Sequence, residues 1–388
     1  MPLLLRLIVV DAISTDEEAD DRRLLTKLVE IHDGRSPNSI ERIPAGLGSR
    51  RFYRIRFSRG LPASLVARLE QDEASRSGQA GHEEPPPWLP EPSLEPLRQF
   101  LEEAGLPVPR SSAHLPDQGI DLLEDVGDRT LLDIRGEQRD SLYEKAVEII
   151  PRLQALSSDS ARIPAFGRIF DRALIDTKAW KWLHWTIPGL LGRPPSKSET
   201  DSLHTGFEQI ATMLDDAPRR LAHRDFKAEN LHLISEPRSD RAEISDPRSH
   251  QESPAAADRL VMIDVQGAFM APPEYDLVCL LYDLQTDLDE DFIMNLFADT
   301  LSQLPDHSSL SQAALRFDAL ATLRLCKDIS HLVHAARTRQ DDRRWHEIPR
   351  GLTLLERSTG RLTRTFPEFR TLTSVIQALT LAAGSSDS

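Results

Sequence analysis

Two stretches of this sequence decide how it folds: His223-Arg224-Asp225-Phe226-Lys227-Ala228-Glu229-Asn230, and the later apolar run Leu260-Val261-Met262-Ile263-Asp264. The first places an Asn five residues after an Asp, and the second ends in another Asp. When a phosphoryl group moves from ATP to a hydroxyl, one carboxylate takes the hydroxyl proton, while an Asn and a second carboxylate hold magnesium. The pattern therefore predicts phosphoryl transfer from ATP with Mg²⁺.

The composition limits the class of protein. The chain has 388 residues, 39% of them hydrophobic, and a formal net charge of −15 from 47 Lys and Arg against 62 Asp and Glu. This length predicts two or three domains or one large bilobal one. The acidic balance argues against a nucleic-acid partner, which would normally require a basic face. It does not argue against ATP, because a local basic pocket can lie on an acidic protein.

The two cysteines, Cys279 and Cys326, each lie in an apolar helical pattern and are interpreted as buried fillers rather than a disulfide or metal pair. The apolar start, residues 1–11, has no basic lead and no cleavage site, and is predicted to be a strand or a loose extension. No later apolar run approaches the roughly 20 residues of a membrane helix. We therefore expect a cytoplasmic protein with no membrane partner; the sequence does not indicate its oligomeric state.

The first part of the chain is rich in strand-like patterns. Helical spacing over residues 21–31 precedes two apolar runs, 52–57 and 65–69, which a short polar link at 58–60 joins into a predicted hairpin. Another strand is predicted near residues 119–128, where the chain leaves through a Gly-containing turn.

The rest of the chain is mostly helical. A helix is predicted over residues 94–101 and ends at Gly105, and from Tyr143 onward helical patterns dominate, apart from a strand–loop–strand within 221–267. This segregation predicts an α+β protein of two lobes.

Two polar inserts interrupt the pattern. Residues 71–93 are rich in Glu, Ser, Gly and Pro, and residues 235–259 contain almost no large apolar side chains, so both are predicted to be surface insertions, the second of them disordered. We divide the chain into an N-terminal lobe, residues 1–125, and a helical C-terminal lobe, residues 126–388. The C-terminal lobe would carry the catalytic loop 223–230 and the metal-binding segment 263–268.

Six short motifs follow one another between residues 46 and 282. They are Gly48-Ser49-Arg50-Arg51-Phe52-Tyr53-Arg54-Ile55, Gly105-Leu106-Pro107-Val108-Pro109, Leu123-Glu124-Asp125-Val126-Gly127-Asp128, His223-Arg224-Asp225-Phe226 with Asn230, Ile263-Asp264-Val265-Gln266-Gly267-Ala268, and Tyr275-Asp276-Leu277-Val278-Cys279-Leu280-Leu281. Together they resemble the aminoglycoside-phosphotransferase (kinase-like) superfamily, and within it the bacterial kinases that phosphorylate the anomeric hydroxyl of N-acetylmuramate and N-acetylglucosamine. Each motif alone is a weak signal, whereas six in order are much stronger.

The resemblance implies a bilobal protein-kinase-like fold with ATP and Mg²⁺ as cofactors. Asp225 would be the catalytic base, Asn230 and Asp264 would bind Mg²⁺, and Arg224 would help to order the acceptor. Lys227 stands where the superfamily commonly has His or Gln. It resembles the lysine of Ser/Thr protein-kinase catalytic loops, which faces the transferred phosphate.

The remaining expected ATP contacts lie in the N-terminal part. Arg68 lies where kinases have a strand lysine that contacts the ATP phosphates, and a guanidinium can also bind phosphate oxygens. Glu95 is the expected ion-pair partner of Arg68, and Glu91 is nearly as well placed. The turn containing Gly48 and Ser49 would cover the phosphates. The backbone from Glu124 to Val126 would read adenine.

Several residues also have purely structural interpretations. We expect His223 to be a structural hydrogen-bonder and Asp276 to anchor the catalytic-loop backbone. Trp180, Trp182 and Trp185 resemble a sugar-stacking cluster, but aromatics at helical spacing are more often packing residues.

The resemblance implies phosphorylation of a sugar hydroxyl, with the anomeric hydroxyl of N-acetylmuramate or N-acetylglucosamine favoured, in cell-wall sugar recycling. An aminoglycoside or other small-molecule kinase is one alternative, and a pseudokinase is another, motivated by Arg68 and Lys227. Ala271-Pro272-Pro273-Glu274 resembles the end of a protein-kinase activation segment, but it follows Asp264 almost at once. A protein kinase is therefore disfavoured, because no room remains for an activation loop that would bind a peptide. Lys178 stands near a position where these sugar kinases tend to carry Glu. If that Glu contacts the sugar, we expect a different acceptor for this protein.

Overall fold

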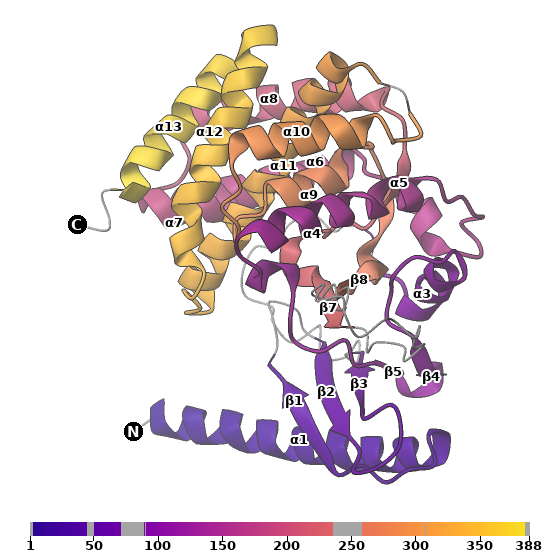
Figure 1. Cartoon of the computed structure of the whole chain (residues 1–388). Helices are drawn as coiled ribbons and strands as arrows, with labels where there is room; N and C mark the ends of the chain where they lie inside the picture. The colour runs from indigo at the N-terminus through magenta and orange to yellow at the C-terminus, as the bar shows by residue number, and fades with distance from the viewer. Residues whose placement is uncertain are drawn as a thin grey trace, which may run out of the picture. The chain divides into compact units, whose positions relative to one another are not determined.

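The computed structural model describes residues 3–44, 50–70, 89, 91–235, 258–306 and 308–384. It consists of two compact units, Met1–His82 with Pro107–Gly127, and Glu83–Leu106 with Asp128–Ser388 (Figure 1). Our division at residue 125 placed the helix α3 (Leu94–Glu103) in the N-terminal lobe, whereas α3 groups with the second unit because it packs against the short helix η6 (Val265–Gly267).

The first unit is built on a five-stranded antiparallel sheet with strand order β1-β2-β3-β5-β4. Its strands are β1 (Ser39–Ile43), β2 (Arg51–Arg56), β3 (Ser64–Leu69), β4 (Ser111–Leu115) and β5 (Ile120–Glu124), with the short helix η1 (Pro116–Gln118) between β4 and β5. The predicted hairpin is confirmed as β2 and β3, which pair from Arg51 opposite Leu69 to Arg56 opposite Ser64.

The helix α1 (Leu3–His32) packs on this sheet. Its buried residues Leu25, Leu28 and Val29 join Tyr53 and Ile55 in one hydrophobic core. The prediction of a strand or loose extension at the start of the chain is therefore wrong. Neither Gly nor Pro occurs between Leu3 and His32, so nothing in the sequence ends the helix early.

The second unit is mainly helical, which confirms the α+β class (Figure 1). Its α-helices are α3, α4 (Glu137–Val147), α5 (Ile149–Gln154), α6 (Arg172–Lys181), α7 (Ile187–Leu191), α8 (Lys197–Asp215), α9 (Tyr275–Leu281), α10 (Glu290–Leu301), α11 (Leu310–Thr338), α12 (Ile348–Thr365) and α13 (Phe369–Gly384). The π-helical turn η4 (Trp182–Thr186) and the 3₁₀ turns η2 (Leu131–Asp133), η3 (Pro164–Gly167), η5 (Ala228–Asn230), η6 and η7 (Trp345–Glu347) lie between them.

The same unit contains two small antiparallel sheets. In one, β6 (Arg220–Ala222) pairs with β9 (Phe269–Ala271), and in the other, β7 (Leu231–Ser235) pairs with β8 (Asp258–Met262). The β7–β8 pair is the predicted strand–loop–strand. Most of the two predicted inserts lies outside the described residues.

The predicted end of α3 is confirmed in detail. Gly105 has φ +74°, its N–H donates to the carbonyl of Glu102 at 2.9 Å, and the N–H of Leu106 donates to the carbonyl of Leu101 at 2.9 Å. This is the Schellman pattern, in which a left-handed residue satisfies the last carbonyls of the helix.

The long helix α11 packs against α6, α9 and α12. Trp182 is 1% exposed, which agrees with packing rather than sugar stacking for that residue. Among the described helices, none combines the length and the apolar character that crossing a membrane would require.

Candidate active site

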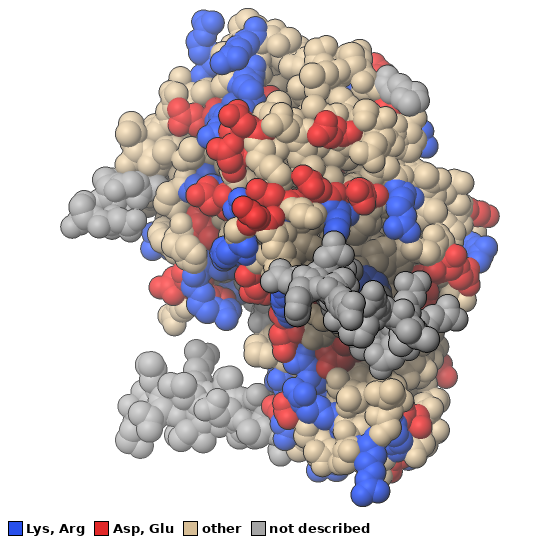
Figure 2. Space-filling model, in the orientation of Figure 1, with Lys and Arg blue, Asp and Glu red and all other residues tan. Residues whose placement is uncertain are grey.

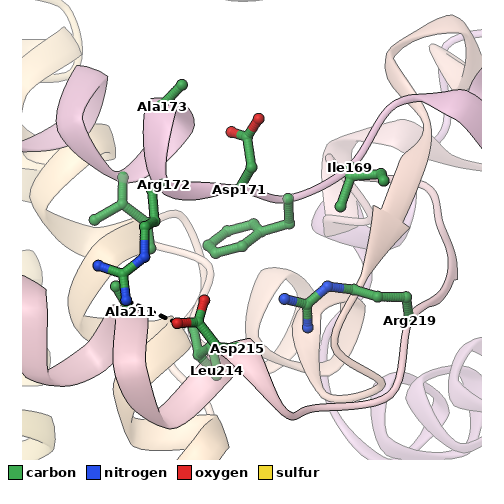
Figure 3. A pocket seen from close by; sticks show the side chains of 10 residues that line it. Ile169, Asp171, Arg172, Ala173, Ala211, Leu214, Asp215 and Arg219 are labelled. Carbon is green, nitrogen blue, oxygen red and sulfur yellow. Dashed lines mark hydrogen bonds and ion pairs between the residues drawn. The ribbon is translucent and has the colours of Figure 1, made fainter.

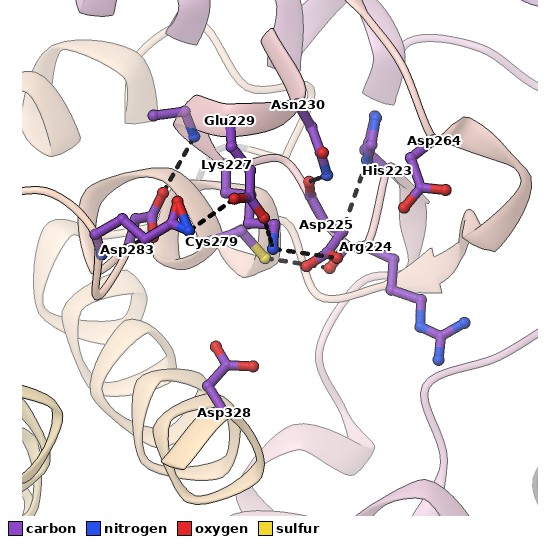
Figure 4. A network of polar contacts seen from close by, with 12 residues as sticks. His223, Arg224, Asp225, Lys227, Glu229, Asn230, Asp264, Cys279, Asp283 and Asp328 are labelled. Carbon is purple, nitrogen blue, oxygen red and sulfur yellow. Dashed lines mark hydrogen bonds and ion pairs between the residues drawn. The ribbon is translucent and has the colours of Figure 1, made fainter. Parts of the chain in front are cut away.

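The two small sheets bring the two diagnostic stretches together. The catalytic loop connects β6 to β7, and the metal-binding segment follows β8 directly. The N–H of Ile263 donates to the carbonyl of Asn230 at 3.0 Å. Asn230 and Asp264, far apart in the sequence, therefore lie at adjoining ends of paired strands (Figure 4).

Backbone hydrogen bonds hold the beginning of the catalytic loop. The buried carboxylate of Asp276, on α9, accepts from the N–H of His223 at 2.7 Å and from the N–H of Arg224 at 3.1 Å. The Nε2 of His223 lies 2.9 Å from the carbonyl oxygen of Ile263. The structural roles expected for Asp276 and His223 are confirmed. Arg224 has φ +80°, a conformation that costs free energy and persists where surrounding contacts impose it.

Asp225 is surrounded by cations. A guanidinium N–H of Arg324 donates to its Oδ1 at 2.8 Å, and the Nζ of Lys227 lies 3.9 Å from its Oδ2. Burial would raise the pKa of Asp225, but Lys227, Arg324 and Lys327 outweigh it and hold that pKa well below its usual range. The carboxylate is therefore ionised at neutral pH and able to accept a proton.

Lys227 and the following residues are also anchored. Burial opposes the charge on Lys227, yet Asp225 and Glu229 outweigh it and raise the pKa of the lysine. Lys227 forms an ion pair with Glu229, whose other carboxylate oxygen accepts from the amide of Gln285 at 2.7 Å. The N–H of Ala228 donates to Asp283 at 3.2 Å. Lys227 thus remains a cation in contact with the catalytic loop.

Arg324 was not identified from the sequence. It lies on α11 and is 5% exposed, and besides Asp225 it donates to the carbonyl of Arg224 at 2.9 Å and pairs with Asp328 at 3.2 Å. The sequence does contain a signal for Arg324, because it is an arginine inside the otherwise uncharged run Leu320–Cys326. Such a run predicts a buried helix, and a buried arginine needs an acidic partner.

The residues predicted to hold Mg²⁺ fit that ion. The amide nitrogen of Asn230 donates to the carbonyl of Asp225 at 2.9 Å, which turns the amide oxygen away from that carbonyl. Asp264 has φ +64°, and its Oδ1 accepts from the amide of Gln266. No group of three His, Cys, Asp or Glu side chains suited to a metal occurs among the described residues. Mg²⁺ needs no such group, because it binds through one or two protein oxygens together with substrate phosphates.

The side chain of Arg224 pairs with Glu91 at 3.1 Å. The ion pair with Arg224 gives Glu91 a different contact from the predicted alternative, Arg68. Arg224 therefore lies at the catalytic loop as predicted, while its role toward an acceptor remains a prediction.

Arg68 and Glu95 were expected to pair with each other, but each has another partner. Arg68 is buried and pairs with Asp121 at 2.8 Å and with Glu70, because Asp121 lies directly opposite it in the β3–β5 register. Glu95 pairs with Arg98 at 2.7 Å, three residues on along α3, where side chains meet on one helix face. The contact of Arg68 with phosphates remains a prediction.

The expected adenine-reading backbone lies at the end of β5. The N–H of Glu124 donates to the carbonyl of Arg110 at 2.8 Å, and the next residue, Asp125, pairs with Arg54 at 2.8 Å. The roles of Glu124 and Val126 are not tested by these contacts. The turn with Gly48 and Ser49 lies outside the described residues.

A pocket of about 340 Å³ lies elsewhere in the second unit (Figure 3). Its lining includes Phe170, Leu214 and Arg219, and an ion pair between Arg172 and Asp215 at 2.7 Å lies on its wall. No residue of the catalytic loop lines it, so we do not assign it to the reaction.

No family model matches the chain. The N-acetylmuramate/N-acetylglucosamine kinase of Pseudomonas aeruginosa is 27% identical over 203 residues, which are 50% of this chain and 51% of that protein. The chain thus matches about half the length of this curated relative.

Several solved structures share the fold. Aminoglycoside 2′-phosphotransferase-IIIa in its GDP complex is 17% identical, with a TM-score of 0.53 over 87% of this chain and 97% of that one. Spectinomycin phosphotransferase with ADP and spectinomycin is 10% identical, with a TM-score of 0.52 over 92% and 98%. A choline kinase of Streptococcus pneumoniae is 14% identical, with a TM-score of 0.51 over 87% and 99%. These likenesses agree with the predicted resemblance at the level of the fold: the chain has the α+β fold that these phosphotransferases and the choline kinase share.

Proposed function

We propose that this protein transfers a phosphoryl group from ATP to a hydroxyl of a small molecule. The observation that carries the proposal is the position of Asp225, an ionised carboxylate beside Asn230 and Asp264. A pseudokinase is disfavoured, because the base and both predicted metal ligands are present and held together by backbone contacts.

Nucleotide and metal have separate sources of support. The similar structures include complexes with GDP and with ADP, and Asn230 and Asp264 offer the oxygen donors that Mg²⁺ prefers. When bound, Mg²⁺ would neutralise charge on the transferred phosphoryl group. Lys227, held as a cation between Asp225 and Glu229, would supply further positive charge beside the base.

The carboxylate of Asp225 would accept the proton of the acceptor hydroxyl as the hydroxyl oxygen attacks the γ-phosphorus. Its low pKa keeps it ready to accept at neutral pH. Arg324 fixes one carboxylate oxygen through a 2.8 Å hydrogen bond, so the other oxygen is the one we assign to the acceptor. The role of Arg324 is to position Asp225.

For the acceptor we propose a sugar hydroxyl. The support is the curated relative, whose name is N-acetylmuramate/N-acetylglucosamine kinase. On the same ground we place the reaction in the recycling of cell-wall amino sugars. Aminoglycoside phosphotransferases among the similar structures make an aminoglycoside the second candidate. It is disfavoured by Lys227, Arg324 and Lys327, whose positive charges lie near Asp225 and would repel a polycation.

The test is ADP release from the purified protein with Mg-ATP and N-acetylmuramate, N-acetylglucosamine, glucose, galactose, kanamycin or no acceptor. We expect stimulation by the N-acetylated sugars. Stimulation by kanamycin alone would support the second candidate.

Asp225→Asn should lower kcat by roughly 10²- to 10⁴-fold, the usual contribution of a general base, and leave ATP affinity nearly unchanged. Asp216→Asn, at an exposed site after α8, is the matched control. Full turnover by Asp225→Asn would contradict the assignment of the base.

A further inference from the structure

A row of titratable side chains leads away from Asp225 along α11. Arg324, Lys327, Asp328 and His331 follow the spacing i, i+3, i+4 and i+7 and therefore share one helix face. Arg324 contacts Asp225, and Figure 4 shows Asp328 on its helix near the catalytic loop. The row thus begins at the proposed base.

The neighbouring helix α6 adds two lysines to this face. Lys178 and Lys181 are three residues apart, and α6 packs against α11. The Nζ of Lys181 lies 2.9 Å from the Nε2 of His331. Burial is the main cause that lowers the pKa of His331 well below its usual range, so the imidazole is neutral and accepts the hydrogen bond of Lys181.

Lys178 is the unusual member of the group. It is 3% exposed, and its amine lies near the cations Lys327, Arg324 and Arg224 and the carboxylate of Asp328. Burial first, and then repulsion from Lys327, hold its pKa well below the usual range. A buried amine that faces more cations than carboxylates is unfavourable in its charged form, which indicates that an anionic partner is missing from the site.

The charges around Lys178 do not balance. Lys327 pairs with Asp328 at 2.9 Å, and Asp328 also pairs with Arg324, which in turn holds Asp225. Leaving aside Lys227, which pairs with Glu229, the basic side chains of Arg324, Lys178, Lys181 and Lys327 thus outnumber the carboxylates of Asp225 and Asp328. The group is open to solvent on one side, since the side chains of Lys327 and Asp225 are 25% and 30% exposed.

We propose that Lys178, Lys181 and Lys327, here called the lysine cluster, bind an anionic group of the acceptor, a carboxylate or a phosphate ester. This inference rests on the proposed function, because it assumes that the acceptor hydroxyl faces Asp225. An anion at the lysine cluster supplies the missing counter-charge. Lys178 and Lys181 then select acidic acceptors over neutral ones.

The test measures binding separately from turnover. Calorimetry without ATP compares three probes: N-acetylmuramate, which carries a carboxylate, neutral N-acetylglucosamine, and N-acetylglucosamine 6-phosphate. The wild-type protein should bind at least one anionic probe roughly tenfold or more tightly than the neutral one, the usual effect of a hydrogen bond to a charged group. The preferred probe distinguishes carboxylate from phosphate, and equal affinity for all three overturns the proposal.

Substitutions of single lysines test which side chains recognise the anion. Lys178→Met should weaken binding of the preferred anionic probe roughly 10- to 100-fold and leave N-acetylglucosamine unchanged, while Lys178→Arg should retain part of the preference. If Lys178→Met does not fold, Lys327→Met replaces it as the test variant, because the Lys327 side chain is partly exposed. Lys197→Met is the control, because Lys197 is 87% exposed on α8. Equal losses for the anionic and neutral probes would contradict a role in anion recognition.

Proton uptake gives an independent reading. Burial is the main cause that lowers the pKa of Lys181 to about 8, and a bound anion favours the protonated amine. Binding of the anionic probe near pH 8 should therefore take up protons, seen as a binding enthalpy that depends on the ionisation enthalpy of the buffer. Binding without proton uptake would overturn the assignment. Anion binding without any turnover would leave the lysine cluster intact and refute the proposed reaction.

Discussion

At the scale of single residues, Arg324 connects the catalytic loop to the helical part of the second unit. It contacts the side chain of Asp225, the carbonyl of Arg224 and the side chain of Asp328. Removal of one partner from a buried ion pair leaves the other charge uncompensated. We therefore expect a substitution at Arg324 to affect both the proposed catalytic base and the stability of the protein.

Arg324→Met should destabilise the protein by about 3–5 kcal/mol at neutral pH, the usual cost of breaking a buried ion pair, and lower kcat. The pKa of Asp225 is depressed in the folded state, so its stabilising contribution is present above the unfolded pKa of about 3.9 and is lost as pH falls through the folded pKa. The difference from wild type, measured by urea unfolding, should shrink below pH 4.

The pH dependence of kcat/KM gives the second readout. Without Arg324 the pKa of Asp225 rises, so the acidic limb of the profile should move to higher pH. Arg324→Lys keeps a positive charge and should restore part of this shift. An unchanged acidic limb in Arg324→Met would show that Arg324 does not act on Asp225.

The sequence predicts contacts between residues that are close in the chain well, and ion pairs between residues that are far apart in the chain poorly. Asn230 follows Asp225 on one loop, and their contact needs only local backbone geometry. The partner of Arg324 lies about a hundred residues away, and helical periodicity indicates that Arg324 is buried without indicating which carboxylate it meets. Arg68 shows the same limit, because its pairing with Asp121 depends on a strand register that the sequence leaves open.

At the scale of elements, α12 offers a matched pair of glycines. A Cβ on Gly351 would lie 2.9 Å from Cγ1 of Ile329 on α11, whereas a Cβ on Gly360 would meet nothing within 4 Å. Gly351→Ala should therefore cost about 1–3 kcal/mol through overpacking, offset in part by better helix propensity. Gly360→Ala should stabilise by about 0.5–1 kcal/mol through propensity alone.

Chemical unfolding of the two variants beside wild type checks this pair. If Gly351→Ala stabilised the protein as much as Gly360→Ala, the close packing of α12 on α11 would be refuted. The packing of these helices matters for the site because α11 carries Arg324.

Elements with explicit end signals could be predicted, and those without them could not. Gly105 ends α3 as expected, since the left-handed residue is visible in the sequence. The start of α1 could not be predicted, because residues 1–11 form an apolar run that is equally typical of a strand. Their continuity with the helix at residues 21–31 is indicated by the lack of Gly and Pro between them.

At the scale of the whole molecule, net charge is a poor guide to the site. The chain carries −15 overall, yet basic and acidic side chains are interspersed over the visible face of the second unit (Figure 2). The surroundings of Lys178 contain more cations than carboxylates. The acidic total would have permitted a polycationic acceptor, whereas the local charges near Asp225 favour an anionic one.

Melting of the whole chain tests whether metal and nucleotide act on the unit that contains Asn230 and Asp264. Mg-ADP at about 100 times its Kd should stabilise this unit by about 2.7 kcal/mol, a rise of roughly 3–5 °C in Tm for a unit of more than 250 residues. Excess EDTA should remove most of the rise, because Asp264 and Asn230 would hold the nucleotide through the metal. Asp264→Asn should show little Mg²⁺-dependent rise, while the control Asp216→Asn should match wild type. An equal rise with EDTA, or in Asp264→Asn, would show that the nucleotide binds without these two ligands, and the metal assignment would then be wrong.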